Sequence, residues 1–282
     1  MTNQAALDTP PIALTIAGSD SSGGAGIQAD LKTFTALGVY GASVVTALTA
    51  QNTRGVTGVH AAPADFIVEQ LDAVFADLAP GAVKTGMLAN AGIVVAVAAR
   101  MERHRGIPLV VDPVMVATSG DRLLTPDAVE AYRRRLFPLA TIVTPNLPEA
   151  AALLDEPIAG DLATAERQAR ALLAFGPQAV LVKGGHATGR EAIDVLASHN
   201  GIEHLSARWI DTRNTHGTGC TLAAAIAALL ARGLTPGAAV VGAKHFLTAA
   251  LAAARTQSIG SGHGPVDHLF DIRRHPLPIG SN

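Results

Sequence analysis

The sequence predicts an α/β fold with a central, mostly parallel β-sheet, helices on both faces and a small antiparallel addition at one edge. Short apolar runs alternate with longer helical stretches along the 282 residues. Most of these runs are continuously apolar, as in strands that are buried on both faces of a parallel sheet. The alternation of strand and helix is typical of a doubly wound sheet.

Each element follows from this pattern in turn. The segments predicted as strands of the parallel sheet are Ile12–Ala17, Ser43–Thr49, Ala82–Lys84, Leu109–Asp112, Thr141–Thr144 and Ala179–Lys183. The segments predicted as helices between and after them lie near residues 26–37, 64–77, 90–104, 126–135, 146–153 and 162–175.

The last third of the chain has a different pattern. Residues 192–207 are predicted to form two strands around His199-Asn200-Gly201, because Asn-Gly favours a tight hairpin turn. Two Ala-rich helices follow, at about 219–232 and 236–254, and Gly233 stands where a glycine ends a helix. The first of these helices is apolar nearly all round, so we expect it to be buried. No domain boundary is evident, and the sequence predicts one domain over residues 1–282.

Composition excludes several functional classes. Apolar residues make up 49% of the chain and charged residues 16%, which favours a large core over disorder. A net charge of −2 gives no basic patch for nucleic acid. The apolar runs are interrupted, the N-terminus has no signal-peptide pattern, and the single cysteine cannot form an intramolecular disulfide. We therefore expect a cytoplasmic protein that binds neither nucleic acid nor membrane.

A glycine-rich segment, residues 17–26, follows the first strand and opens a helix. Glycines there let the backbone approach a ligand closely and expose its N–H groups. The segment matches neither the dinucleotide fingerprint nor the P-loop, so a tight turn without a ligand remains an alternative.

The run Asn214–Cys220 precedes the predicted buried helix. N–H groups at a helix start, together with the helix dipole, favour an anion. Gly217, Thr218 and Gly219 are therefore predicted to hold a phosphoryl group as its charge redistributes. Cys220 lies in the first helical turn, where a lowered thiol pKa is expected, although a small buried filler is the alternative.

The run Gly217–Cys220 resembles the signature of hydroxymethylpyrimidine/phosphomethylpyrimidine kinases, within the ribokinase-like superfamily. The resemblance extends over nearly the whole chain. It includes Ala17–Asp20 through Asp30–Thr33, Ala50–Thr53, Lys84–Leu88, Asp112–Met115, Thr144–Ala150, Val182–His186 and Gly262–Val266. It implies a ribokinase-like fold, ATP and Mg²⁺ as cofactors, and a homodimer. The implied activity is two successive phosphorylations of hydroxymethylpyrimidine, first to its monophosphate and then to the diphosphate, in thiamin biosynthesis.

The expected nucleotide end of the site consists of residues that follow strands. Asp112 ends a strand at the carboxyl edge of the sheet, where open α/β sheets bind ligands, and the resemblance places it near metal and phosphates. Asn146 and Glu149 lie three residues apart, so both can face ATP and Mg²⁺, with Asp112 and Glu149 as metal ligands. Helix capping is the alternative for Asn146 and Glu149. Lys183 matches a catalytic lysine and needs a partner if it is buried.

The expected substrate end depends on Gln51. A primary amide matches the donor and acceptor edge of a 4-aminopyrimidine. The resemblance places Gly18, Asp30 and Met87 in the same pocket. Core packing is the alternative for Met87, and a polar position in the first helix is the alternative for Asp30.

Cys220 departs from the wider superfamily, because related sugar kinases place an Asp base there. We expect Cys220 to be catalytic, with its thiolate helping to remove the proton of the hydroxymethyl group. A titratable thiol need not repel a second substrate that already carries a phosphate, whereas a fixed carboxylate would. Two rival functions stay open at this point. One is pyridoxal kinase activity, and the other is a non-catalytic pyrimidine-binding sensor.

Overall fold

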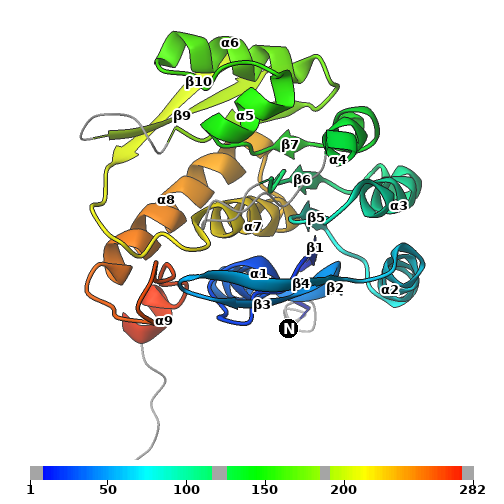
Figure 1. Cartoon of the computed structure of the whole chain (residues 1–282), viewed down its shortest axis with the longest axis horizontal. Helices are drawn as coiled ribbons and strands as arrows, with labels where there is room; N and C mark the ends of the chain where they lie inside the picture. The colour runs from blue at the N-terminus through cyan, green and yellow to red at the C-terminus, as the bar shows by residue number, and fades with distance from the viewer. Residues whose placement is uncertain (1–8, 116–125, 185–190, 275–282) are drawn as a thin grey trace, which may run out of the picture.

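The computed structural model describes residues 9–115, 126–184 and 191–274, so Gly185 and His186 of the Val182–His186 motif lie outside the described residues. Its main sheet has eight strands in the order β10-β9-β8-β7-β6-β5-β1-β2 (Figure 1). The strands are β1 (Ile12–Ala17), β2 (Tyr40–Val45), β5 (Ala82–Thr85), β6 (Leu109–Val111), β7 (Ile142–Val143), β8 (Ala179–Val182), β9 (Glu191–Ser198) and β10 (Gly201–Arg208). The pairs from β2 to β8 are parallel, whereas β9 and β10 pair antiparallel at the edge, which confirms the predicted fold class.

Helices cover both faces of the sheet (Figure 1). One face packs against α2 (Ala64–Asp77), α3 (Ala91–Met101), α4 (Pro126–Ala131), α5 (Leu147–Leu154) and α6 (Leu162–Leu173). The other packs against α1 (Gly26–Ala36), α7 (Thr218–Ala231) and α8 (Pro236–Ala254), and α9 (Phe270–Arg274) follows. Each face has its own apolar cluster, which explains why the strand residues are apolar at successive positions.

The prediction of one strand over Ser43–Thr49 is wrong. The chain leaves the main sheet at Thr46, whose N–H donates to the Ala17 carbonyl at 3.0 Å and whose hydroxyl donates to the Met87 carbonyl at 2.6 Å. It continues as β3 (Ala47–Asn52), which pairs antiparallel with β4 (Gly55–Ala61) in a separate two-stranded sheet. β4 was not predicted, because it is largely exposed on both faces and has no buried apolar row to reveal it.

The predicted hairpin and the two Ala-rich helices are confirmed. β9 and β10 meet at Gly201, and Gly233 follows α7 with a left-handed φ of 86°. Most residues of α7 are buried, as its apolar pattern predicts. α8 is long and apolar enough to cross a membrane by length and composition, but it packs against α7 and β10 as a core helix does.

This topology gathers the segments that follow the parallel strands at one edge of the sheet. Gly18 follows β1, Gly86 follows β5, Asp112 follows β6 and Lys183 follows β8. The carboxyl ends of parallel strands are where open α/β sheets bind their ligands. The start of α7 lies at the same edge, because a Cβ on Gly219 would lie 3.2 Å from Lys183 Nζ and 3.7 Å from Asp112 Oδ2.

Candidate active site

A cavity of about 630 Å³ opens at this edge. Its wall brings together residues that are far apart in sequence. The predicted site residues that line it are Gly18, Gln51, Met87, Asp112, Asn146, Glu149, Lys183, Gly217, Thr218, Gly219 and Cys220. Among the described residues, Asp30 is the predicted site residue that does not line the cavity.

Lys183 lies between two carboxylates. Its Nζ is 3.0 Å from Asp112 Oδ1 and 4.0 Å from Glu149 Oε2, so this partly buried lysine has the partners that burial would require. Burial alone would lower the pKa of Lys183, but Asp112 and Glu149 outweigh burial and raise it. The Thr144 hydroxyl, 3.1 Å from Asp112 Oδ1, fixes the carboxylate. Lys183 is therefore a fixed positive charge at the cavity wall.

Asn146 and Glu149 form the helix cap, and both also line the cavity. The Asn146 side chain accepts from the Glu149 N–H, and Glu149 Oε2 accepts from the Asn146 N–H, each at 2.8 Å, which makes a capping box at the start of α5. Yet Glu149 is only 5% exposed and lines the cavity, so it is not the exposed glutamate of an ordinary cap. Burial raises its pKa to about 7, with Asp112 adding to the rise and Lys183 opposing it.

The donor set at this end fits Mg²⁺. Among residues 9–115, 126–184 and 191–274, no group of three or more His, Cys, Asp or Glu side chains forms a ready metal cage. Mg²⁺ is commonly held by one or two carboxylates with water and phosphate oxygens completing the shell, and Asp112 and Glu149 supply such a pair. A buried carboxylate with a raised pKa would also be stabilised as an anion by a nearby cation.

The predicted phosphate-binding segment is tightly packed. Gly217 caps α7 with a φ of 78°, and a Cβ at this position would lie 1.8 Å from the Gly24 carbonyl oxygen. A Cβ on Gly219 would lie 3.2 Å from Lys183 Nζ, so the first turn of α7 meets the lysine directly. The Thr218 N–H donates to the Thr215 carbonyl at 3.2 Å. Consequently Gly219 and Cys220, within the first turn, carry the N–H groups best placed to receive an anion.

Cys220 does not have the lowered thiol pKa that its place in the helix predicts. Burial raises the pKa of Cys220 to about 11, and this outweighs the opposing effects of Lys84 and of the Gly26 N–H, which hydrogen-bonds the sulfur. The helix-start argument omitted desolvation, which is the larger effect here. Cys220 is therefore a thiol at neutral pH, lying at the wall of the cavity, and not the thiolate base that the sequence predicts.

The predicted substrate end consists of Gly18, Gln51 and Met87, which all line the cavity. A Cβ on Gly18 would lie 2.5 Å from Met87 Cε, so the methionine methyl packs on the bare glycine backbone. Gln51 projects from β3, and its Oε1 lies 3.1 Å from Thr49 Oγ1. The small β3–β4 sheet thus forms one wall of this end.

Asp30 lies behind the cavity wall. It is fully buried, accepts from the Thr15 hydroxyl at 2.6 Å and pairs with Lys84 Nζ at 2.8 Å. Burial alone would lower the pKa of Lys84, but Asp30 outweighs it and raises that pKa, so the lysine stays charged. Lys84 lines the cavity in place of Asp30, and the predicted direct contact of Asp30 with substrate does not fit this placement.

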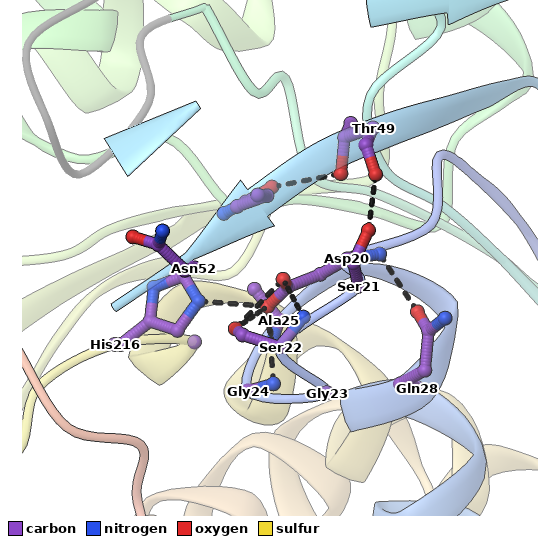
Figure 2. Close-up of polar contacts among 12 residues, drawn as sticks. Asp20, Ser21, Ser22, Gly23, Gly24, Ala25, Gln28, Thr49, Asn52 and His216 are labelled. Carbon is purple, nitrogen blue, oxygen red and sulfur yellow. Dashed lines mark hydrogen bonds and ion pairs between the residues drawn. The ribbon is translucent and has the colours of Figure 1, made fainter. Parts of the chain in front are cut away.

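Sequence reasoning missed Asp20 and His216, which also line the cavity. Figure 2 shows the His216 ring pointing at the Asp20 carboxylate. Both residues stand inside segments that the sequence singled out for their glycines. The pairing joins positions 196 residues apart, and no local pattern predicts such a contact.

Comparison with known proteins shows the family to which the chain belongs. Residues 20–267 match the family model for phosphomethylpyrimidine kinase. The chain belongs to this family. A family relative, the hydroxymethylpyrimidine/phosphomethylpyrimidine kinase of Rhizobium meliloti (strain 1021), is 58% identical over 92% of this chain and 97% of its own length.

Two solved structures show the same fold. The phosphomethylpyrimidine kinase of Clostridium difficile 630 superposes with a TM-score of 0.74 at 44% identity, covering 84% of this chain and 97% of that one. An ADP complex of Bacillus subtilis pyridoxal kinase superposes with a TM-score of 0.86 at 38% identity, covering 93% and 98%. The ribokinase-like fold implied by the sequence resemblance is confirmed.

Proposed function

We propose that this chain transfers the γ-phosphoryl group of ATP to hydroxymethylpyrimidine, and then to the resulting monophosphate, in thiamin biosynthesis. The observation that carries the proposal is the shared cavity, whose lining includes the Gln51 amide, the Lys183 ammonium group and the start of α7. The Rhizobium meliloti relative bears the corresponding name at 58% identity. We further propose that residues 1–282 act as one domain in the cytoplasm.

In this proposal Gln51 binds the aminopyrimidine edge, with Gly18 and Met87 packing against the ring. The N–H groups at the start of α7 and Lys183 stabilise the transferring phosphoryl group, whose charge spreads over its oxygens in a loose transition state. Asp112, Asn146 and Glu149 face the nucleotide phosphates, and Mg²⁺ bound by the two carboxylates would neutralise phosphate charge.

Cys220 is proposed to lie beside the attacking hydroxyl as a neutral thiol. A loose phosphoryl-transfer transition state needs little proton removal before the new bond forms, so a thiol with a raised pKa is compatible with this role. A neutral side chain also does not repel the phosphate of the second substrate.

We also propose a homodimer formed through the β3–β4 sheet. Leu48 and Val59 on this sheet are 58% and 49% exposed, and Tyr40 on the neighbouring β2 is 55% exposed. A two-stranded sheet with an exposed apolar face is marginally stable by itself, and a second copy of the chain would cover that face.

The test is a product assay with hydroxymethylpyrimidine, ATP and Mg²⁺, with pyridoxal supplied in a parallel reaction. The monophosphate should appear first and the diphosphate after it. Turnover of pyridoxal alone would show that the protein is a pyridoxal kinase. Binding of hydroxymethylpyrimidine without turnover would show that it is a sensor. Gln51→Leu should lower kcat/KM for the pyrimidine by about 10- to 100-fold, since it leaves the amino edge without its hydrogen-bond partner.

A further inference from the structure

The Asp20–His216 pair joins the two loops that border the cavity. Asp20 lies in the glycine-rich loop between β1 and α1, and His216 lies just before α7. His216 Nε2 is 2.8 Å from Asp20 Oδ2, and the two residues are 5% and 1% exposed (Figure 2). Both line the cavity, so the pair is part of its wall.

The Asp20 carboxylate is saturated with donors. Its Oδ1 accepts from the Ser22 N–H at 2.8 Å, and its Oδ2 accepts from the N–H groups of Gly24 at 3.0 Å and Ala25 at 2.8 Å. Burial would raise the pKa of Asp20, but the hydrogen bonds from His216 and Ser22 outweigh burial and lower it. The charge therefore fixes the loop and presents little uncompensated repulsion to a neighbouring phosphate.

The backbones behind the pair touch. A Cβ on Gly24 would lie 2.4 Å from His216 Cδ2, and one on Gly217 would lie 1.8 Å from the Gly24 carbonyl oxygen. On the opposite side, the His216 N–H donates to the Gly264 carbonyl at 3.0 Å. His216 is thus held from both sides, and Gly217, the next residue, has no free space in which to shift.

The glycine-rich loop also carries the substrate end of the cavity. The Ile27 N–H donates to the Gly18 carbonyl at 3.0 Å, and the Asp20 N–H donates to Gln28 Oε1 at 2.8 Å. A change in the position of Asp20 would therefore be passed to Gly18 in one direction and to Gly217 in the other.

We propose that Asp20 and His216 are positioning residues that align the phosphate-binding start of α7 with the substrate hydroxyl. This inference rests on the proposed kinase function. It gives a role to two residues that are not among the predicted site residues. The pair acts through Gly217 and the N–H groups that follow it. Because misplacement of a reacting group by about 1 Å can cost about 100-fold in rate, the pair should influence kcat more than ground-state binding.

The experiment compares Asp20→Asn, His216→Phe, the double variant and His216→Gln, which retains a donor. We expect Asp20→Asn and His216→Phe each to lower kcat by about 10- to 100-fold, with KM for pyrimidine and ATP changed by less than about threefold. The double variant should lose no more than the worse single variant, since one interaction is broken in all three. His216→Gln should recover part of kcat.

A second measurement separates positioning from general damage. Affinity for ADP with Mg²⁺ and aluminium fluoride, which takes the place of the transferring phosphoryl group, should fall in parallel with kcat, whereas affinity for ADP alone should stay within about threefold. The matched control is Asp161→Ala, which removes an exposed N-cap of α6 that accepts from the Thr164 N–H at 2.7 Å. It should lower the melting temperature by a few degrees and leave kcat intact.

Additive losses in the double variant, a rise in KM with kcat unchanged, or equal loss of affinity for ADP with and without aluminium fluoride would overturn the inference. The proposed function is judged separately, by turnover of the wild-type chain. An active wild type with unaffected variants would refute the positioning role alone.

Discussion

At the scale of single residues, environment decides the chemistry of the site more than residue type does. Cys220 lies at a helix start, beside the charged Lys84, and accepts a hydrogen bond from Gly26, yet burial raises its pKa to about 11. Burial likewise raises the pKa of Glu149 to about 7. In both cases desolvation exceeds the attraction of a nearby lysine.

Replacement of Cys220 by Asp tests the value of a neutral side chain here. Cys220→Asp should harm the second phosphorylation more than the first, by about 10-fold or more, because its carboxylate would repel the phosphate of the second substrate. The two steps are measured separately, with the monophosphate supplied for the second.

Cys220→Ser is the control for that replacement, since it is neutral and similar in size. It should affect the two steps alike. Equal losses of kcat/KM in both steps for Cys220→Asp would mean that charge at this position does not distinguish the substrates.

At the scale of elements, the glycine that begins α7 and the glycine that ends it offer a matched comparison. Both have left-handed φ angles, 78° at Gly217 and 86° at Gly233. A Cβ at Gly233 would meet nothing within 4 Å, whereas one at Gly217 would collide with the Gly24 carbonyl oxygen. The two positions share backbone strain and differ in free space.

Gly233→Ala should therefore lower the free energy of unfolding by about 1 kcal/mol and leave activity intact. Gly217→Ala should lower the free energy of unfolding further and reduce kcat by about 100-fold or more, because the two loops must separate to admit the methyl group. Denaturant unfolding and steady-state kinetics measure the two effects. Equal behaviour of the two variants would show that the contact with Gly24 is unimportant.

The elements also show what could be read from the sequence. Buried strands and helices have an apolar pattern, so β1 and α2 match their predicted bounds, and β8 and α7 are close to theirs. The break at Thr46 and the exposed β4 have no such pattern, because hydrogen bonds to the distant Ala17 and Met87 set the break. Site residues at strand ends were predictable for the same reason, whereas Asp20–His216 depends on a contact between distant segments.

At the scale of the whole molecule, acid stability depends partly on His268 near the C-terminal end of the described chain. His268 is 4% exposed, and its Nε2 lies 2.9 Å from Thr221 Oγ1, whose hydroxyl also donates to the Gly217 carbonyl at 2.8 Å. Burial lowers the pKa of His268 to about 4, with Lys32 and His216 adding to the effect.

Because the folded pKa lies below the unfolded value of about 6.5, the unfolded chain binds a proton that the folded chain refuses. The contribution of neutral His268 to the free energy of unfolding is therefore complete above pH 6.5, and it is lost as the pH falls toward 4. His268→Gln, which can still donate to Thr221, should lose less unfolding free energy over that range than the wild type. Denaturant unfolding at pH 7, 6 and 5 gives the comparison, in which other titrating groups such as Glu149 largely cancel. Parallel curves for the two proteins would contradict this role.

The contacts that hold His216 have a consequence for how the protein folds during its synthesis on the ribosome. His216 is joined at once to Asp20, near the beginning of the chain, and to Gly264, near its end. Strands β1 to β8 can emerge and pair while synthesis continues, but the start of α7 has its second support only when residue 264 has left the exit tunnel. Nascent chains should therefore form the sheet well before the start of α7 is aligned at the cavity. A chain whose synthesis stops before residue 264 would have the fold of the enzyme without the alignment on which its chemistry depends.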